Sequence, residues 1–462
     1  MLCLRKKKVR IHPSREQLRV EEHRSASVED VVDNLVSRRT GIVSEFSVAS
    51  RDTTEPHRPM VWRAKLANHA FAADPDDSHL YCSGKGFTTR DAWLSCIGEA
   101  AERYSGGRWS WDELTVAARA QLTTSSIDPR DLVLYRPEQY ALLPYAPYED
   151  ETELTWIEGR SLVRDEAVWV PAIAALMEFT IRSEAEFLFP ITSNGLAAGP
   201  TLRDAVVSAI YEVIERDAFL ISWLNRLPAR VLDAGTHPDP DVRDLASAYR
   251  RRGVRLALFL LPTDHPVSVV MGVAFQEGGF GGPAATVGLG AHLEPVAAAR
   301  QAVLEVGQVR PAFRERIRDR DQARVAELVD DPTRVATMED HSLLYADPAM
   351  VRAFDFLDGD ETPWDEAADV GGPPDNAALD QLIDHFASVG QDVAYVNLTS
   401  PDVERLGIHT ARAVLPGFQP IWFGQQECRL AGRRLYDLPH RLGLQDTPSD
   451  PTSLNPLPHP LA

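Results

Sequence analysis

The sequence repeats the pattern Ser-x-x-x-Glu-x-x-Glu-Arg, first as Ser95-Cys-Ile-Gly-Glu99-Ala-Ala-Glu102-Arg103 and again as Ser208-Ala-Ile-Tyr-Glu212-Val-Ile-Glu215-Arg216. At about 100° per residue, the four polar positions of each copy fall on one narrow helix face. The surrounding positions are apolar, whereas an ordinary surface helix has a wide polar face. We therefore expect two mostly buried helices, each with a carboxylate stripe that faces an internal cavity.

The paired carboxylates need a compensating charge. Two ionised carboxylates one helical turn apart repel each other and are costly to desolvate. A divalent cation is the usual compensation, and oxygen ligands without a Cys/His cluster favour Mg²⁺ over Zn²⁺. The alternative is a buried network in which each Glu pairs with a nearby Arg. Two copies with the same spacing favour the metal.

Glycine-containing stretches precede both helices, and a third helix carries a similar stripe. We expect glycine turns at Ser83–Thr88 and Thr192–Gly199, where backbone N–H groups could approach a phosphate and Lys85 could supply a charge. Neither stretch is a Walker P-loop. The third helix is expected at Pro295–Val309, with Gln301, Glu305 and Gln308 on one face. Together these features suggest a nucleotide triphosphate with Mg²⁺ between the repeats.

Composition excludes several other classes of protein. The 48 basic and 68 acidic side chains leave a formal charge of −20, which argues against nucleic-acid or anionic-membrane binding. No uncharged apolar run reaches the ~20 residues that span a bilayer, and the start lacks the apolar core of a signal peptide. The four cysteines are widely separated, so neither a zinc ribbon nor a disulfide framework is supported. We expect a soluble cytoplasmic protein.

The pattern along the chain favours a mixed α/β (α+β) fold with three parts. Residues 1–39 are expected to be a basic, partly disordered N-terminal segment, and residues 40–443 a catalytic domain. Within that domain, residues 357–376 are rich in carboxylates and are expected to form an exposed loop. Residues 444–462 are a Pro-rich tail with no expected helix or strand.

These motifs resemble the YcaO family, ATP-dependent enzymes that modify backbone amides of ribosomally made peptides. The resemblance runs from Gly41 to the end of the chain and includes the third-helix motif Gln301-x-x-x-Glu305-x-x-Gln308-x-Arg310, Val396-Asn-Leu-Thr399 and Val414-Leu-Pro-Gly417. It implies a YcaO-type fold with ATP and Mg²⁺ as cofactors. The implied metal ligands are Glu99, Glu102, Glu212 and Glu215. The implied nucleotide-site residues are Lys85, Ser95, Glu99, Arg103, Asn194, Ser208, Glu212, Arg216, Gln301, Glu305 and Arg310.

The end of the chain is similar to that of azoline-forming cyclodehydratases. Pro456, Pro458 and Pro460 form a Pro-x-Pro-x-Pro end, which in those enzymes points into the active site. A polyproline II segment is stiff and loses little entropy when it docks. The Ala462 carboxylate or His459 could then act as a proton acceptor.

The resemblance implies cyclodehydration of Cys, Ser or Thr in a ribosomal precursor peptide to thiazoline or (methyl)oxazoline. A leader-peptide-binding domain would not fit before Gly41, so a separate, ThiF-like partner protein is expected, and a homodimer is possible. Three rival hypotheses remain open. They are thioamide or amidine formation by the same ATP activation, a non-catalytic nucleotide-binding scaffold subunit and, from the residues alone, a Mg²⁺/ATP-dependent ligase.

Overall fold

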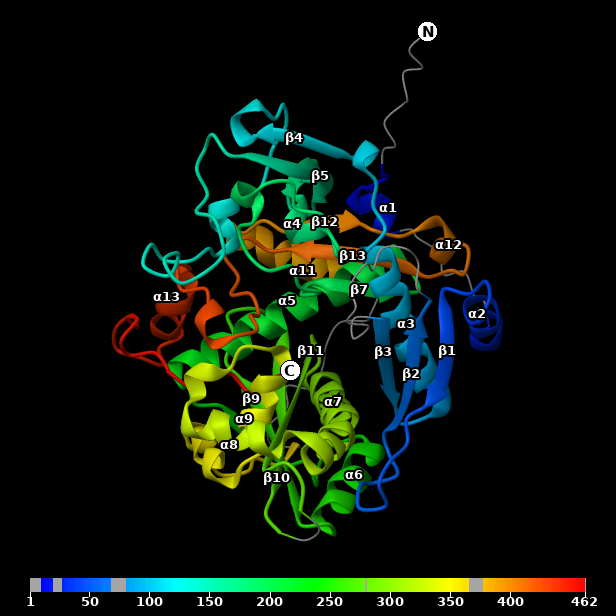
Figure 1. Cartoon of the computed structure of the whole chain (residues 1–462), viewed down its shortest axis with the longest axis vertical. Helices are drawn as coiled ribbons and strands as arrows, with labels where there is room; N and C mark the ends of the chain where they lie inside the picture. The colour runs from blue at the N-terminus through cyan, green and yellow to red at the C-terminus, as the bar shows by residue number, and fades with distance from the viewer. Residues whose placement is uncertain (1–9, 20–26, 68–79, 279–280, 365–376, 462) are drawn as a thin grey trace.

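Three antiparallel sheets and the helices between them make up the computed structural model, which describes residues 10–19, 27–67, 80–278, 281–364 and 377–461 (Figure 1). The expected mixed fold is confirmed. The first sheet has the order β1-β2-β3, with β1 (Val43–Val48), β2 (Met60–Leu66) and β3 (Tyr81–Gly86). The second has the order β11-β10-β9-β8, with β8 (Arg230–Leu232), β9 (Val254–Leu261), β10 (Ser268–Gln276) and β11 (Ala285–His292).

The third sheet is the largest. It has the order β4-β5-β12-β13-β7, and β6 also pairs with β5. Its strands are β4 (Leu114–Ala118), β5 (Glu153–Ser161), β6 (Ala167–Pro171), β7 (Leu196–Gly199), β12 (Ala394–Asn397) and β13 (His409–Val414). The strands β3, β7 and β11 each lie at an edge of their sheet, so each leaves one row of backbone N–H and C=O groups unpaired within its sheet.

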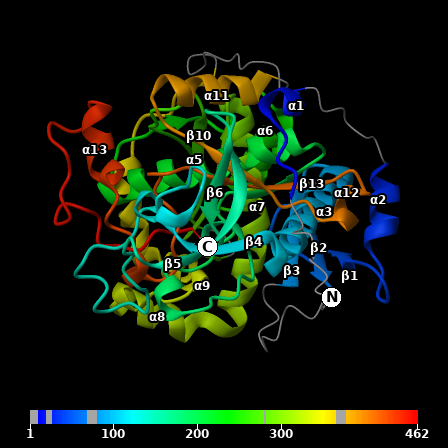
Figure 2. The same ribbon diagram turned by 90° about the horizontal axis from the view of Figure 1, so that it is seen from above.

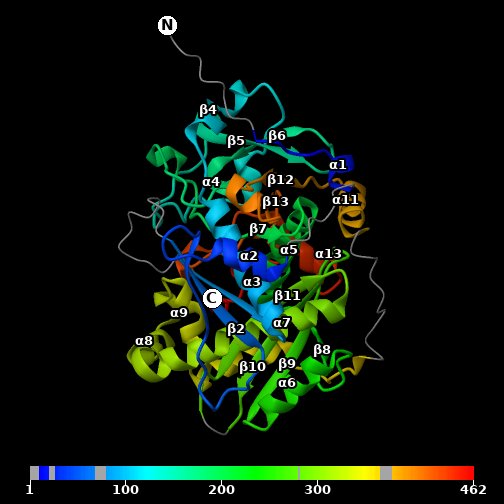
Figure 3. The ribbon, with the colours of Figure 1, turned by 90° about the vertical axis from the view of Figure 1, so that its right-hand side faces the viewer.

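Each of these edge strands is followed by one of the three helices with a polar stripe. These are α3 (Thr89–Gly106), α5 (Leu202–Asn225) and α7 (Pro295–Arg316). The first two begin at threonine caps, where Thr88 and Thr201 accept a hydrogen bond from the backbone N–H three residues later. Helix α3 packs between the first and third sheets, α5 between the third and second, and α7 between the second and first (Figure 3). Three strand–helix units therefore surround one central region.

Glycines in the edge strands allow the helices to approach closely. A Cβ atom on Gly84 would lie 1.9 Å from the backbone nitrogen of Cys96, and one on Gly86 would lie 2.5 Å from that of Ala92. Gly84 and Gly86 belong to β3 itself, so the expectation that they form a phosphate-binding turn is wrong. Gly199 plays the same packing role at the end of β7, where its Cβ would lie 2.5 Å from the nitrogen of Ala205.

The N-terminal segment is better packed than its composition suggested. Helix α1 (Arg15–Arg19) buries Leu18 completely, and the Tyr395 hydroxyl donates a hydrogen bond of 2.5 Å to the carbonyl of Pro13. The expectation of poor order is therefore wrong for residues 10–19, while residues 1–9 and 20–26 lie outside the described residues. Helix α2 (Val28–Leu35) begins after Ser27, whose side chain accepts a hydrogen bond from the Asp30 backbone N–H.

The remaining helices are α4 (Ala172–Ala175), α6 (Pro240–Arg250), α8 (Gln322–Asp330), α9 (Met338–Leu344), α11 (Ala378–Ser388), α12 (Pro401–Glu404) and α13 (Arg433–Arg441). Among them, α4 and α6 pack against strands of the third and second sheets, α11 and α13 pack against α5, and α8 packs against α9, while α5 runs near the middle of the molecule (Figure 2). The expected acidic loop is only partly described, because residues 365–376 lie outside the described residues. In the described part, residues 357–364, Leu357 and Trp364 are buried, so the expectation of an exposed loop does not hold for these two residues. Among the described helices, none has the length and apolar character needed to cross a bilayer.

Candidate functional site

The carboxylates of the three stripes lie close enough to affect one another's ionisation. Burial raises the pKa of Glu102 on α3 well above its ordinary value, and the charge of Glu212 on α5 raises it further. Burial likewise raises the pKa of Glu99, and the charge of Glu305 on α7 adds to this rise. The structure therefore brings together side chains from both repeats and from the third helix, as the sequence predicted.

Two of these carboxylates also bind the free edges of the sheets. The Ser83 backbone N–H on β3 donates a 3.0 Å hydrogen bond to Glu99 Oε2. The Leu289 backbone N–H on β11 donates a 3.2 Å hydrogen bond to Glu305 Oε2. Lys85 Nζ, also from β3, lies 3.7 Å from the same Glu305 oxygen. Ser83 and Lys85, which lie in the stretch expected to form the first glycine turn, therefore contact these carboxylates from strand β3.

Arginines offset part of the negative charge. Arg103 Nη2 lies 3.5 Å from Glu99 Oε1, and Arg216 Nη2 lies 3.4 Å from Glu215 Oε1. The rival network of Glu–Arg pairs is therefore partly present. Even so, burial raises the pKa of Glu215 to about 8. The negative charge of Glu305 adds to this rise, and the positive charge of Arg216 opposes it. The arginines do not fully compensate the buried carboxylates.

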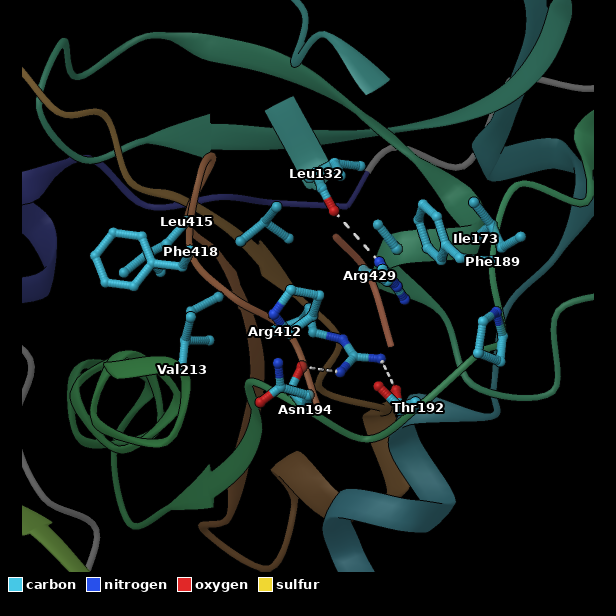
Figure 4. A pocket seen from close by; sticks show the side chains of 15 residues that line it. Leu132, Ile173, Phe189, Thr192, Asn194, Val213, Arg412, Leu415, Phe418 and Arg429 are labelled. Carbon is cyan, nitrogen blue, oxygen red and sulfur yellow. Dashed lines mark hydrogen bonds between the residues drawn. The ribbon is translucent and has the colours of Figure 1, made fainter. Parts of the chain in front are cut away.

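Sequence reasoning missed Arg412, a fourth cation at this site. Arg412 lies on β13 and is 2% exposed, and its guanidinium donates to the backbone carbonyls of Ala175, Thr192 and Asn194 (Figure 4). Burial lowers its pKa to about 10, while the charges of Glu212 and Glu102 oppose the fall. The sequence did contain an indication of this role. An arginine among the apolar residues of a buried strand such as β13 must find partners for its charge.

The other predicted nucleotide-site residues lie at varied positions. Ser95 and Ser208 are exposed, each one turn before the first glutamate of its stripe. Gln301 Oε1 accepts a 3.3 Å hydrogen bond from the Ala291 backbone N–H on β11. Arg310 is not brought to the carboxylates, because it is completely buried against Glu55, with 3.5 Å between Nε and Oε1.

The donor set fits a hard cation, although it does not form a finished cage. Among the described residues, no three acidic, His or Cys side chains converge closely enough to hold a metal ion. Mg²⁺ in nucleotide sites takes only one or two protein carboxylates and completes its shell with phosphate oxygens and water. Buried carboxylates whose pKa values are raised, with oxygen as their only donor atom, fit that requirement.

The end of the Pro-rich tail, residues 458–461, is buried beside this site. His459 is completely buried, its Nε2 lies 2.9 Å from the Trp422 carbonyl oxygen, and its ring stacks on His341 at 3.9 Å between centroids. Burial lowers the pKa of His459 well below its ordinary value, and the nearby charge of Arg216 contributes. The ring of His459 is thus enclosed by protein and held neutral, and its predicted role as a proton acceptor stays a prediction. Ala462 lies outside the described residues, so its predicted role stays a prediction.

A sequence profile of one protein family matches most of the chain. The profile is that of the YcaO cyclodehydratases, described as binding ATP and Mg²⁺, and it matches residues 83–419. An uncharacterised protein of Methanothermobacter thermautotrophicus is 34% identical over 229 residues, which are 49% of this chain and 56% of that protein. The match therefore spans little more than half the length of this relative.

Solved structures share the fold. A heterocyclase in complex with substrate and cofactor superposes with a TM-score of 0.79 at 24% identity, over 99% of this chain and 60% of that chain. The YcaO protein of Methanopyrus kandleri, bound with AMPPCP and Mg²⁺, gives a TM-score of 0.57 at 21% identity, over 82% of this chain and 86% of that chain. At these identities the superpositions establish the fold.

Proposed function

The chain belongs to the YcaO family, whose cofactors are ATP and Mg²⁺, and we propose that it is an ATP-dependent peptide cyclodehydratase. One observation carries this proposal. Helices α3, α5 and α7 bring five glutamates together, of which Glu215 is buried and the other four are half-buried, although their charges repel. Holding like charges in this way costs stability and is expected only where a cation and phosphates use them.

The proposed reaction converts Cys, Ser or Thr of a precursor peptide to an azoline. The side-chain sulfur or oxygen adds to the preceding carbonyl carbon, and its proton passes to a base. The former carbonyl oxygen takes the γ-phosphoryl group of ATP and leaves as phosphate, while the amide nitrogen loses its proton and the C=N bond forms. The peptide therefore loses one water in total, and ATP becomes ADP and phosphate. Phosphoryl transfer depends mainly on positioning and charge neutralisation.

The chain's own residues suit the positioning part of this reaction. We propose that the Mg²⁺ ligands come from Glu99, Glu102, Glu212 and Glu215, with no more than two carboxylates on any one ion, and that Lys85, Arg103, Arg216 and Arg412 neutralise phosphate charge. The Ala462 carboxylate stays the candidate base. We also propose that a separate leader-peptide-binding partner delivers the precursor peptide.

Removal of single site carboxylates tests the proposal. Glu99→Gln and Glu215→Gln are each expected to lower ATP turnover at least a hundredfold without unfolding the chain, because the amide cannot hold Mg²⁺ but fills the same space. Glu404→Gln on the exposed α12 is the matched control and is expected to keep full activity. Phosphate release and the melting temperature are measured for all three. Wild-type turnover in both site variants would remove the metal assignment.

The mass of the product peptide separates the rival reactions. A candidate precursor is incubated with the protein, its partner, ATP and Mg²⁺, and its intact mass is measured. Loss of one water per modified residue supports cyclodehydration. Exchange of oxygen for sulfur would indicate a thioamide instead, and an unchanged mass with bound nucleotide would favour the scaffold hypothesis.

A further inference from the structure

A small pocket adjoins the carboxylates on the side of β13, and we call it the Arg429 pocket (Figure 4). Its volume is about 80 Å³, which is room for about three water molecules at roughly 30 Å³ each. Its apolar walls are Leu132, Ile173, Phe189, Val213, Leu415 and Phe418. Its polar lining includes Asn194, Arg412 and Arg429.

Two buried polar atoms of this lining have no hydrogen-bond partner among the described residues. They are Asn194 Oδ1, an acceptor, and Arg429 Nε, whose N–H is a donor. Arg429 is 4% exposed, its Nη1 donates to the Leu132 carbonyl at 3.3 Å, and its guanidinium lies 4.2 Å from the ring centre of Phe189. Leaving a buried donor and a buried acceptor unsatisfied is costly, so a site for a complementary group is indicated.

From this pair of atoms we infer that the Arg429 pocket binds a peptide group of the substrate next to the residue that is cyclised. The substrate carbonyl accepts from Arg429 Nε–H, and the substrate N–H donates to Asn194 Oδ1. The inference rests on the proposed function, since it supplies the peptide-binding part of the same site. Arg412 connects the two parts, because it lines the pocket and its charge acts on Glu102 and Glu212.

Other kinds of occupant satisfy these atoms less well. A phosphate or carboxylate could accept from Arg429 but would be repelled by the Asn194 carbonyl oxygen. A purely apolar side chain would suit the walls and leave both polar atoms unsatisfied. A peptide group offers one donor and one acceptor, and a small side chain beside it can contact the apolar walls.

Steady-state kinetics test the inference in the working enzyme. Arg429→Lys keeps the positive charge but removes Nε–H, so the KM for precursor peptide is expected to rise about tenfold while the KM for ATP stays within twofold. Arg433→Lys, the same change at a side chain that is 92% exposed, is the matched control. An unchanged peptide KM in Arg429→Lys, or equal changes in both KM values, would overturn the inference.

A binding measurement decides the inference even if no precursor peptide is turned over. Crystals of the full chain are soaked with N-acetylcysteine N-methylamide, a single residue flanked by two peptide groups. We expect the probe in the pocket with one peptide group between Asn194 and Arg429, and weaker binding in Ala174→Leu, which fills the pocket from its wall. Ordered water alone in wild-type crystals at tens of millimolar probe would refute it. Failure of the mass experiment, in contrast, refutes only the proposed reaction.

Discussion

Glu215 links stability to pH through its position among other charges. The pKa of Glu215 is about 8 in the folded chain, whereas the ordinary value is 4.5. At a pH between these two values, the folded state therefore keeps a proton that the unfolded state has released. Its contribution to stability is therefore complete below pH 4.5 and is lost as the pH rises through 8. Glu99, Glu102 and Glu212 act in the same direction, because burial raises their pKa values too.

We predict that the metal-free protein loses thermal stability as the pH rises from 4.5 to about 8, and that Glu215→Gln loses less. Each unit of pKa difference corresponds to about 1.4 kcal/mol, so the loss amounts to roughly a few kcal/mol. Melting temperatures in EDTA, measured for wild type and variant in the same buffers, check this. Parallel pH profiles for the two proteins would show that Glu215 ionises normally in the fold.

Single residues also show the limits of sequence reasoning. The spacing of Glu99 and Glu102, and that of Glu212 and Glu215, was enough to predict that each pair lies on one helix face, because this depends only on helix geometry. That the two faces meet was inferred from the repeat and from the family resemblance. Arg412 was missed because its partners lie some 200 or more residues away in sequence. Arg310 could have been rejected, since five residues beyond Glu305 place it about 140° around the helix.

At the level of elements, the position of each polar stripe depends on how closely its helix packs against the preceding edge strand. The glycines of β3 and β7 were expected to bind phosphate, because sequence alone does not show which backbone lies opposite them. In the fold they lie against α3 and α5, and they set the distance at which the carboxylates meet the strand edges.

Two glycine substitutions in one strand–helix unit test this view. Gly84→Ala is expected to destabilise the chain by about 3 kcal/mol or more, because its Cβ would overlap the backbone of Cys96. Gly98→Ala, within α3, meets no atom within 4 Å and is expected to stabilise the chain by about 0.5–1 kcal/mol. Urea denaturation measures both. Equal tolerance of the two changes would contradict the packing role of Gly84.

At the level of the whole molecule, the C-terminal tail connects elements that are distant in sequence. The Trp223 indole on α5 donates a 3.0 Å hydrogen bond to the Leu457 carbonyl, and the hydroxyl of Tyr345, just after α9, donates to that of Pro458. Gln425 donates to the Pro456 carbonyl at 2.8 Å. Sequence predicted a tail without helix or strand, and this is confirmed, but composition alone gave no sign that the tail is part of the core.

His459 is the residue through which this tail is expected to be held. His459→Ala would remove the stacking on His341 and the contact with the Trp422 carbonyl and leave a cavity, so we predict a loss of about 2–4 kcal/mol in unfolding free energy. Pro456→Ala changes an exposed position of the same tail and is expected to cost less than about 0.5 kcal/mol. Urea denaturation and nucleotide binding are measured together. The carboxylates are held by α3, α5 and α7 rather than by the tail, so His459→Ala is expected still to bind nucleotide but to lose peptide modification. Loss of nucleotide binding in a folded variant would instead place the tail within the nucleotide site itself.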